Sequence, residues 1–196
     1  MLYGPMTHPG LLAALGRSGH SGKILITDGN YPVASGAPTS AERIFLNLAP
    51  GLLNVTQILA VLKDTIPIER AGLMVPAADA TGIERPDVIP AHDEYRAALP
   101  DVAFDEIPRW DFYDVAKSQD VTVVIVSADQ RLYANLLLTI GVRTVTVPWC
   151  RAEFQELNPA CLPMRVELVP RRGADSRQGW PGGFPGHPCR SHVMKW

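Results

Sequence analysis

Short apolar runs rich in β-branched side chains alternate with segments of helical periodicity over the first 147 residues of this chain. The runs at 23–28 (KILITD) and 121–127 (VTVVIVS) have successive apolar residues at their centres, which is typical of strands covered on both faces of a sheet. Between them, apolar residues recur at helical spacing, for example over 51–64. This alternation predicts an α/β domain with a largely parallel sheet flanked by helices.

The same patterns predict the position of each element. The expected strands cover 23–28, 71–76, 102–107, 121–127 and 142–148, and the expected helices cover 8–19, 51–64, 90–99, 109–119 and 131–141. In open α/β sheets, ligands collect at the carboxyl ends of the strands. Asp28 and residues 127–130 are therefore expected at the binding edge. His20 precedes its strand, so it would reach the same pocket only through another loop or another subunit.

Residues 148–196 have a different composition from the rest of the chain. Proline and glycine supply 12 of these 49 residues, and the segment contains seven basic and four acidic side chains. Such a segment buries too little apolar surface to offset the entropy lost on ordering. We therefore expect one domain over 1–147 and a disordered or loosely packed tail over 148–196. The histidines and cysteine near its end match no common metal-site spacing.

The overall composition limits the classes of partner. The chain is 46% hydrophobic and 19% charged with a net charge of −2, which gives no electrostatic footprint for nucleic acid or an anionic membrane. No apolar run approaches the roughly 18 residues of a membrane span. The first residues lack a signal-peptide pattern, and the three cysteines form no CxxC pair. A cytoplasmic protein without nucleic-acid or membrane partners is expected.

Two residues near the first strand are candidates for chemistry, each with an ordinary structural alternative. His20 lies in a Gly-Ser-Gly-rich turn and Asp28 follows the strand. A histidine there can simply be stabilised by the C-terminal dipole of the preceding helix, and Asp-Gly is a common turn pair. No GxSxG, GxGxxG or GxxxxGK[ST] motif is present, and HDEY at 92–95 is typical of a solvated helix face. The residues thus predict a polar pocket with an acid/base candidate, without an indicated cofactor or metal.

Four short motifs lie in one order along the chain. They are GH at 19–20, DGNYP at 28–32, RWDFYDVA at 109–116 and YANLLLTIGV at 133–142. Their sequence, order and spacing resemble those of the fucose mutarotase / ribose pyranase (RbsD/FucU) family. Each motif is weak evidence alone, whereas four in register are fairly specific. The resemblance runs from about residue 9 to residue 142 and does not include the tail.

The resemblance implies a three-layer RbsD-like fold and a cofactor-independent isomerase that interconverts sugar anomers or ring forms. It also implies a ring-shaped homo-oligomer, commonly a decamer, with pockets at subunit contacts. His20 would be the proton donor and acceptor, a role that suits imidazole because it titrates close to neutral pH. By the same resemblance, the monosaccharide would be bound by Asp28, Arg109, Tyr133, Ala134 and Asn135.

Arg109 falls where fucose-type members carry arginine and ribose-type members carry histidine, so L-fucose is the favoured substrate. Two positions depart from the family pattern: Gly22 replaces an aspartate that usually follows the histidine, and Ala128-Asp129 replaces Gly-Glu. The group that steadies the imidazole is therefore missing from its usual position. The alternatives are a D-ribose pyranase, a non-catalytic sugar-binding or transport-accessory protein, and an oligomeric structural protein.

Overall fold

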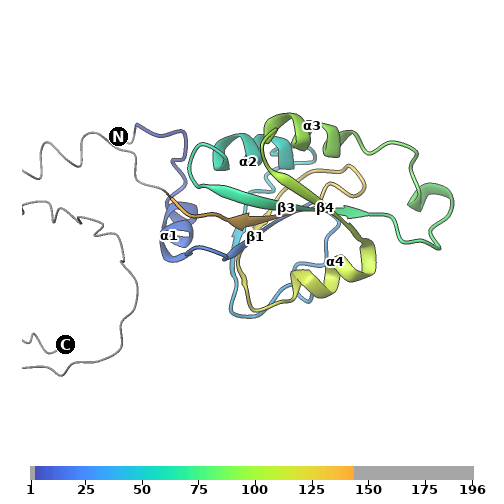
Figure 1. Cartoon of the computed structure of the whole chain (residues 1–196), viewed down its shortest axis with the longest axis horizontal. Helices are drawn as coiled ribbons and strands as arrows, with labels where there is room; N and C mark the ends of the chain where they lie inside the picture. Colours follow the sequence, from blue (N-terminus) through green and yellow to red (C-terminus); the bar gives the residue numbers. More distant parts are fainter. Residues whose placement is uncertain (1–2, 144–196) are drawn as a thin grey trace, which may run out of the picture. The chain divides into compact units, whose positions relative to one another are not determined.

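The computed structural model describes residues 3–143, which form a six-stranded sheet with helices on both faces (Figure 1). The strands are β1 (Lys23–Thr27), β2 (Glu42–Phe45), β3 (Ile68–Val75), β4 (Ala103–Pro108), β5 (Val121–Val126) and β6 (Leu136–Ile140). The helices are α1 (Pro9–Arg17), α2 (Val55–Leu62), α3 (Pro90–Ala98) and α4 (Arg109–Ala116), with a short 3₁₀ helix, η1 (Gly82–Glu84). The tail at 148–196 and most of the strand expected at 142–148 lie outside the described residues.

The sheet has the strand order β2-β5-β1-β6-β3-β4 and is mostly parallel, as predicted. β5 runs parallel to both β2 and β1, and β3 runs parallel to β4. β6 is the exception, because it lies between β1 and β3 and is antiparallel to both. The carboxyl end of β1 therefore lies beside the beginning of β6.

The helix predicted over 131–141 is wrong, because its second half is the strand β6. Three successive leucines, Leu136 to Leu138, favour a helix on local propensity alone. In the fold these residues are buried on both faces of the sheet and their backbone groups pair with two neighbouring strands. Tyr133, with a φ of +59°, also precludes a continuous helix. Tertiary pairing thus overrides the local preference.

The other elements predicted within residues 3–143 are confirmed, with some changes at their ends. The prediction that HDEY at 92–95 is a solvated helix face is wrong, because His92 and Tyr95 are buried against the sheet. α1 begins with Pro9 in its first turn, and the His8 side chain accepts a hydrogen bond from the Leu11 backbone N–H. α2 begins at Val55 because Asn54 and Gln57 form a capping box there. β2 was not predicted, since its sequence ERIF has two charged residues and lies at the edge of the sheet.

Two hydrophobic cores, one on each face of the sheet, give the predicted three layers. Along β1, Ile24 and Ile26 lie in one core and Leu25 in the other, as expected from the alternation of side chains in a strand. The first core is shared with α1, α2 and α3, and the second with α4 and the loop at 31–41. Figure 1 shows α2 and α3 on the opposite side of the sheet from α4. Coverage of both faces explains why the central strands are almost wholly apolar.

Candidate functional site

A pocket of about 240 Å³ opens at the carboxyl end of β1. Its walls come from the turn after β1, the η1 segment, the first turns of α4 and the turn before β6. The lining residues are Asp28, Asn30, Tyr31, Met74, Ile83, Glu84, Arg109, Tyr113, Leu132, Tyr133 and Asn135. The mixture of aromatic, carboxylate, amide and guanidinium groups suits a small polar ligand.

Asp28 and Asn135 form a reciprocal pair at the base of this pocket. The Asp28 backbone N–H donates to Oδ1 of Asn135 at 2.8 Å, and Nδ2 of Asn135 donates to Oδ2 of Asp28 at 2.8 Å. The Asn30 backbone N–H donates to the other carboxylate oxygen at 2.9 Å. Burial raises the pKa of Asp28 to about 6, although the hydrogen bonds from Asn30 and Asn135 oppose that rise. The carboxylate is therefore held in a fixed orientation and titrates near neutral pH.

Tyr133 enters the pocket from a strained turn. Its φ of +59° is rare for an aromatic residue, and such conformations persist only where surrounding contacts enforce them. His92 Nε2 donates to the Tyr133 carbonyl oxygen at 3.0 Å, and the Tyr133 hydroxyl donates to the carbonyl of Glu84. One residue later, the Tyr95 hydroxyl donates to the Ala134 carbonyl at 2.8 Å. α3 thus fixes two consecutive carbonyls of this turn.

Arg109 reaches the pocket because it begins α4 directly after β4. Its Nη1 lies 3.1 Å from Glu84 Oε1, and its guanidinium carbon lies 5.0 Å from the centre of the Trp110 ring. A hydrogen bond with Tyr113 and the nearby Glu84 raise the pKa of Arg109 above its ordinary value. The guanidinium remains charged and can donate several hydrogen bonds in a fixed plane.

The residues after β5 also lie beside Asp28, as predicted from the position of that strand. The Gly29 backbone N–H donates to the Asp129 carbonyl at 2.7 Å. The Asp129 carboxylate is 2% exposed and accepts from Arg131 and from the Val55 backbone N–H. Burial opposes ionisation of Asp129, but the bonds from Arg131 and the backbone hold its pKa below the ordinary value. Its oxygens are already bonded, so Asp129 organises loops and does not face the ligand.

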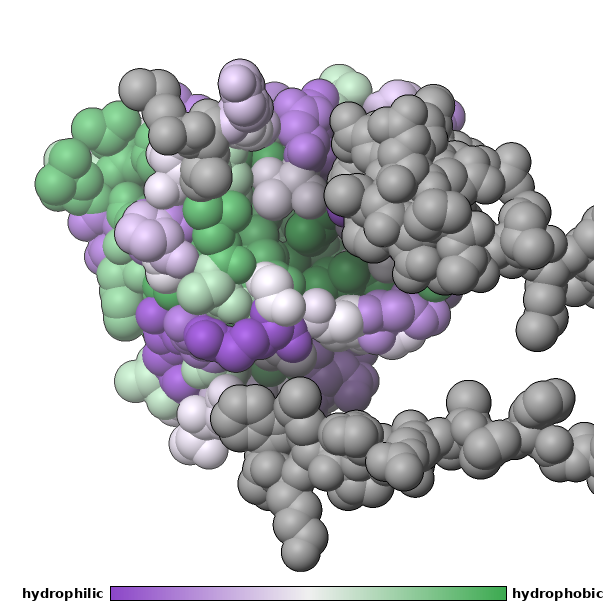
Figure 2. All heavy atoms as spheres, turned by 90° about the vertical axis from the view of Figure 1, so that its left-hand side faces the viewer, coloured by the Kyte–Doolittle hydropathy of each residue, from purple (hydrophilic) through white to green (hydrophobic). Residues whose placement is uncertain are grey.

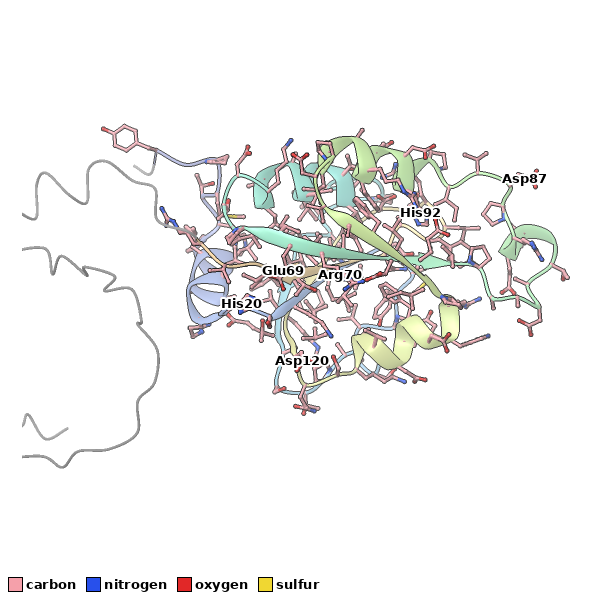
Figure 3. The ribbon with its side chains drawn as sticks, in the orientation of Figure 1. His20, Glu69, Arg70, Asp87, His92 and Asp120 are labelled. Atoms are coloured by element: carbon pink, nitrogen blue, oxygen red, sulfur yellow. The ribbon has the colours of Figure 1, made fainter. Side chains whose placement is uncertain are left out.

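His20 lies at the other end of β1, outside the pocket. The turn that carries it is bonded to the end of β6: the Ser21 N–H donates to the Ile140 carbonyl and the Ile140 N–H donates to the Gly22 carbonyl, each at 2.9 Å. The His20 side chain is 53% exposed, and its Nε2 lies 3.2 Å from Oε2 of Glu69 on β3 (Figure 3). The structure therefore brings together Asp28, Arg109, Tyr133 and Asn135, with Ala134 between the last two, and leaves His20 apart.

Sequence reasoning missed several residues around these groups. Asn30 and Tyr31 directly follow Asp28 in one of the motifs, so their proximity could have been inferred. Glu84 comes from a loop rich in proline and polar residues that gave no signal. The Glu69 carboxylate beside His20 is 49 residues away in sequence and joins it only through the pairing of β3 with β6.

Taken together, the pocket can bind a small polyhydroxylated molecule through two carboxylates, two amides, one guanidinium and aromatic rings. Within residues 3–143, no cluster of three His, Cys, Asp or Glu side chains is arranged to hold a metal ion. In that same part of the chain, no helix has the length and apolar character needed to cross a membrane.

Comparison with known proteins identifies relatives of the described domain. The model of the RbsD / FucU transport protein family matches residues 1–143. The human protein "Fucose mutarotase" is 34% identical over 141 residues, which cover 68% of this chain and 88% of the human protein. "D-ribose pyranase" of Paracidovorax citrulli is 28% identical over 137 residues, or 70% of this chain and 95% of that protein.

A solved structure has the same fold. The fucose mutarotase from Streptococcus pneumoniae, determined in complex with L-fucose, aligns with a TM-score of 0.60 and 22% identity over 74% of this chain and 100% of that chain. At this identity the similarity establishes the fold, and it agrees with the RbsD-like architecture predicted from the motifs.

Proposed function

Because this chain belongs to the RbsD / FucU transport protein family, we propose that it is a monosaccharide mutarotase that interconverts the anomers of L-fucose or a similar sugar without a cofactor. Its relatives are named fucose mutarotase and D-ribose pyranase, both isomerases of sugars. The observation that carries the proposal is the meeting of Asp28, Asn135, Arg109 and Tyr133 in one pocket. Cytoplasmic location stays a prediction from composition.

The chemistry needs one proton removed and one delivered. A base takes the proton of the anomeric hydroxyl, the bond between the anomeric carbon and the ring oxygen breaks as the carbonyl forms, and an acid protonates the ring oxygen. Rotation about the next carbon–carbon bond and the reverse steps close the other anomer. In this proposal His20 exchanges the protons, since imidazole both accepts and donates near neutral pH. Asp28, Arg109, Tyr133, Asn135 and the Ala134 backbone hold the sugar.

The position of His20 requires a second copy of the chain. β1 separates His20 from Asp28 within one copy, so the imidazole must enter the pocket of a neighbouring subunit. We propose a closed ring of subunits, of which a decamer is the expected form, with each pocket completed across a contact. Figure 2 shows an apolar patch beside a band of hydrophilic side chains on one side of the molecule, and such a patch suits a contact between subunits.

Arg109 favours a fucose-type over a ribose-type substrate. Its planar donors would bond to sugar oxygens in a geometry that another cation does not reproduce. The alternatives are a D-ribose pyranase and a sugar-binding or transport-accessory protein that retains the pocket without efficient proton transfer. The pyranase differs from a fucose mutarotase in the sugar whose exchange it accelerates, and the binding protein differs because it accelerates no exchange. One assay of anomer exchange therefore separates the three.

Saturation-transfer NMR on L-fucose, D-ribose and D-galactose tests the proposal directly. The full-length chain should accelerate exchange between the anomers of L-fucose, and His20→Gln should reduce that rate by about 10²–10⁴-fold, the usual effect of a positioned acid/base group. Light scattering should give the mass of a large oligomer for both proteins. Binding without acceleration would favour the non-catalytic alternative, acceleration only for D-ribose would favour the pyranase, and a catalytically active monomer would contradict the shared site.

A further inference from the structure

We infer that Glu69 is a positioning residue for His20, and that it holds the neutral imidazole in the tautomer that leaves Nδ1 free to exchange the proton. The inference rests on the proposed role of His20. It assigns to this chain a carboxylate–imidazole pair formed between the turn before β1 and the beginning of the strand β3. It also names the nitrogen that faces the sugar.

The contact itself sets the direction of the hydrogen bond. Nε2 of His20 lies 3.2 Å from Oε2 of Glu69, and Figure 3 shows the two side chains next to each other. An ionised carboxylate only accepts hydrogen bonds. The neutral imidazole must therefore carry its hydrogen on Nε2, which leaves the lone pair on Nδ1. This is the arrangement by which a carboxylate fixes the tautomer of a histidine in other proton-transfer sites.

No other described group competes for the ring with comparable geometry. The Ser21 hydroxyl lies 3.5 Å from both ring nitrogens, at the outer limit of hydrogen bonding. Nδ1 is therefore available to a group from outside this copy. The half-exposed position of His20 has the same consequence, since a fully buried ring would not reach a neighbouring pocket.

The backbones that carry the pair are fixed independently of the contact. Ser21, with a φ of +65°, and Gly22 are bonded to Ile140 on β6 at 2.9 Å in both directions. The Gly141 N–H donates to the Pro67 carbonyl at 2.9 Å, directly before β3. The end of β6 thus joins the His20 turn to the strand that carries Glu69. The relative position of the two side chains follows from the sheet and does not depend on their weak mutual attraction.

The space for Glu69 depends on a glycine. A Cβ atom on Gly141 would lie 3.2 Å from Cβ of Glu69 and 3.6 Å from its Oε2. The contact with Cβ of Glu69 is tighter than usual, so a side chain at position 141 would shift the Glu69 side chain and with it the carboxylate. Gly141→Ala therefore offers a second way to disturb the pair without removing either ionisable group.

An ordinary surface ion pair is the competing explanation, and it makes a different prediction. Both side chains are about half exposed, so the contact adds little to stability. Lys23 and Asp120 form a comparable exposed pair, at 3.4 Å, at the same end of β1. Asp120→Asn removes one carboxylate from that end without touching His20, which makes it the matched control for Glu69→Gln.

The test combines kinetics with the nitrogen spectrum of the histidine ring in the full-length protein. Glu69→Gln should lower kcat for L-fucose anomer exchange by about 10–100-fold, the usual cost of losing such a partner, with little change in KM. Asp120→Asn should leave both unchanged. With ¹⁵N-labelled histidine above pH 8, the His20 signals should show the Nε2–H tautomer in the wild type and a mixture of tautomers in Glu69→Gln and Gly141→Ala.

The outcomes separate this inference from the proposed function. If His20→Gln abolishes exchange but Glu69→Gln retains the wild-type kcat and tautomer, the role of Glu69 is wrong and the proposed function stands. If His20→Gln exchanges sugar at the wild-type rate, the acid/base assignment fails and the inference fails with it. An Nδ1–H tautomer in the wild-type protein would also overturn the inference, whatever the kinetics.

Discussion

Asp28 and Asn135 hold each other in place through two hydrogen bonds of opposite direction, although they are 107 residues apart in sequence. Asp28 directly follows β1, and Asn135 directly precedes β6, the antiparallel neighbour of β1. The pair is therefore a product of strand pairing. It fixes the orientation of the carboxylate and the amide at the base of the pocket.

The raised pKa of Asp28 predicts a specific pH dependence of stability. The native carboxyl titrates at about 6 and the unfolded one near 3.8, so between these values the native state binds the proton more strongly. The free energy of unfolding should therefore fall as the pH rises from 4 to 6, by at most about 3 kcal/mol. Urea denaturation of wild type and Asp28→Asn at several pH values isolates this contribution. A constant difference between the two proteins across this range would contradict the prediction.

Replacing the amide of Asn135 should disturb the pair more at neutral than at acidic pH. Asn135→Asp keeps the size of the side chain but sets a second carboxylate against Asp28 and removes the Nδ2 donor. We expect a loss of about 1–3 kcal/mol at pH 7 and a smaller loss at pH 5, where one carboxyl of the pair is protonated. Asn47→Asp, at an exposed position, is the control. Equal losses at both pH values would show that charge repulsion is not the cause.

A sheet flanked by helices could be predicted from the sequence because strands covered on both faces have apolar residues at successive positions. Residues 24–26 and 123–126 are apolar on successive positions, and neither a surface strand nor an amphipathic helix has that pattern. β6 was mistaken for a helix because its leucines carry no β-branched signal. Only its pairing with β1 and β3 decides its conformation.

The candidate site was predicted only in part for a related reason. Asp28 follows from the position of a strand end, whereas Arg109, Tyr133, Ala134 and Asn135 came from resemblance. The meeting of Asp28, Tyr133 and Asn135 in one pocket depends on strand order. Neither the periodicity nor the composition of the sequence predicts that β6 pairs with β1 on one side and β3 on the other. The contact of Glu69 with His20 depends on that same pairing and had no sequence signal.

Substitution of Arg109 should affect ligand binding more than stability. The exposed contact with Glu84 contributes about 1 kcal/mol or less, so Arg109→Lys should change the melting temperature little. Loss of the planar donors should raise KM for the sugar about tenfold, because a hydrogen bond to a charged group contributes about 1.5–3 kcal/mol. Arg70→Lys alters a similar exposed pair with Asp105 and is the matched control. Unchanged kinetics in Arg109→Lys would exclude Arg109 from the site.

His92 should control binding through the backbone of Tyr133. His92 Nε2 donates to the Tyr133 carbonyl at 3.0 Å, and burial lowers the pKa of His92, so the ring stays neutral at physiological pH. His92→Leu leaves that buried carbonyl without its donor, which should lower the free energy of unfolding by about 1–3 kcal/mol. Without that donor, Tyr133 should relax from its positive φ to a more favourable conformation. Its side chain would then be displaced in the pocket, which should raise KM for the sugar.

A conservative variant distinguishes positioning from packing at this residue. His92→Gln retains an N–H donor and should restore most of the affinity that His92→Leu loses. Because the native ring binds its proton more weakly than the unfolded one, the wild type should lose stability as the pH falls below about 6.5. His92→Gln, which does not titrate, should lack that contribution to the loss. Calorimetric titration with L-fucose and urea denaturation at pH 5 and 7 provide both measurements. Wild-type affinity in His92→Leu, together with lowered stability, would show that His92 supports the fold without positioning Tyr133.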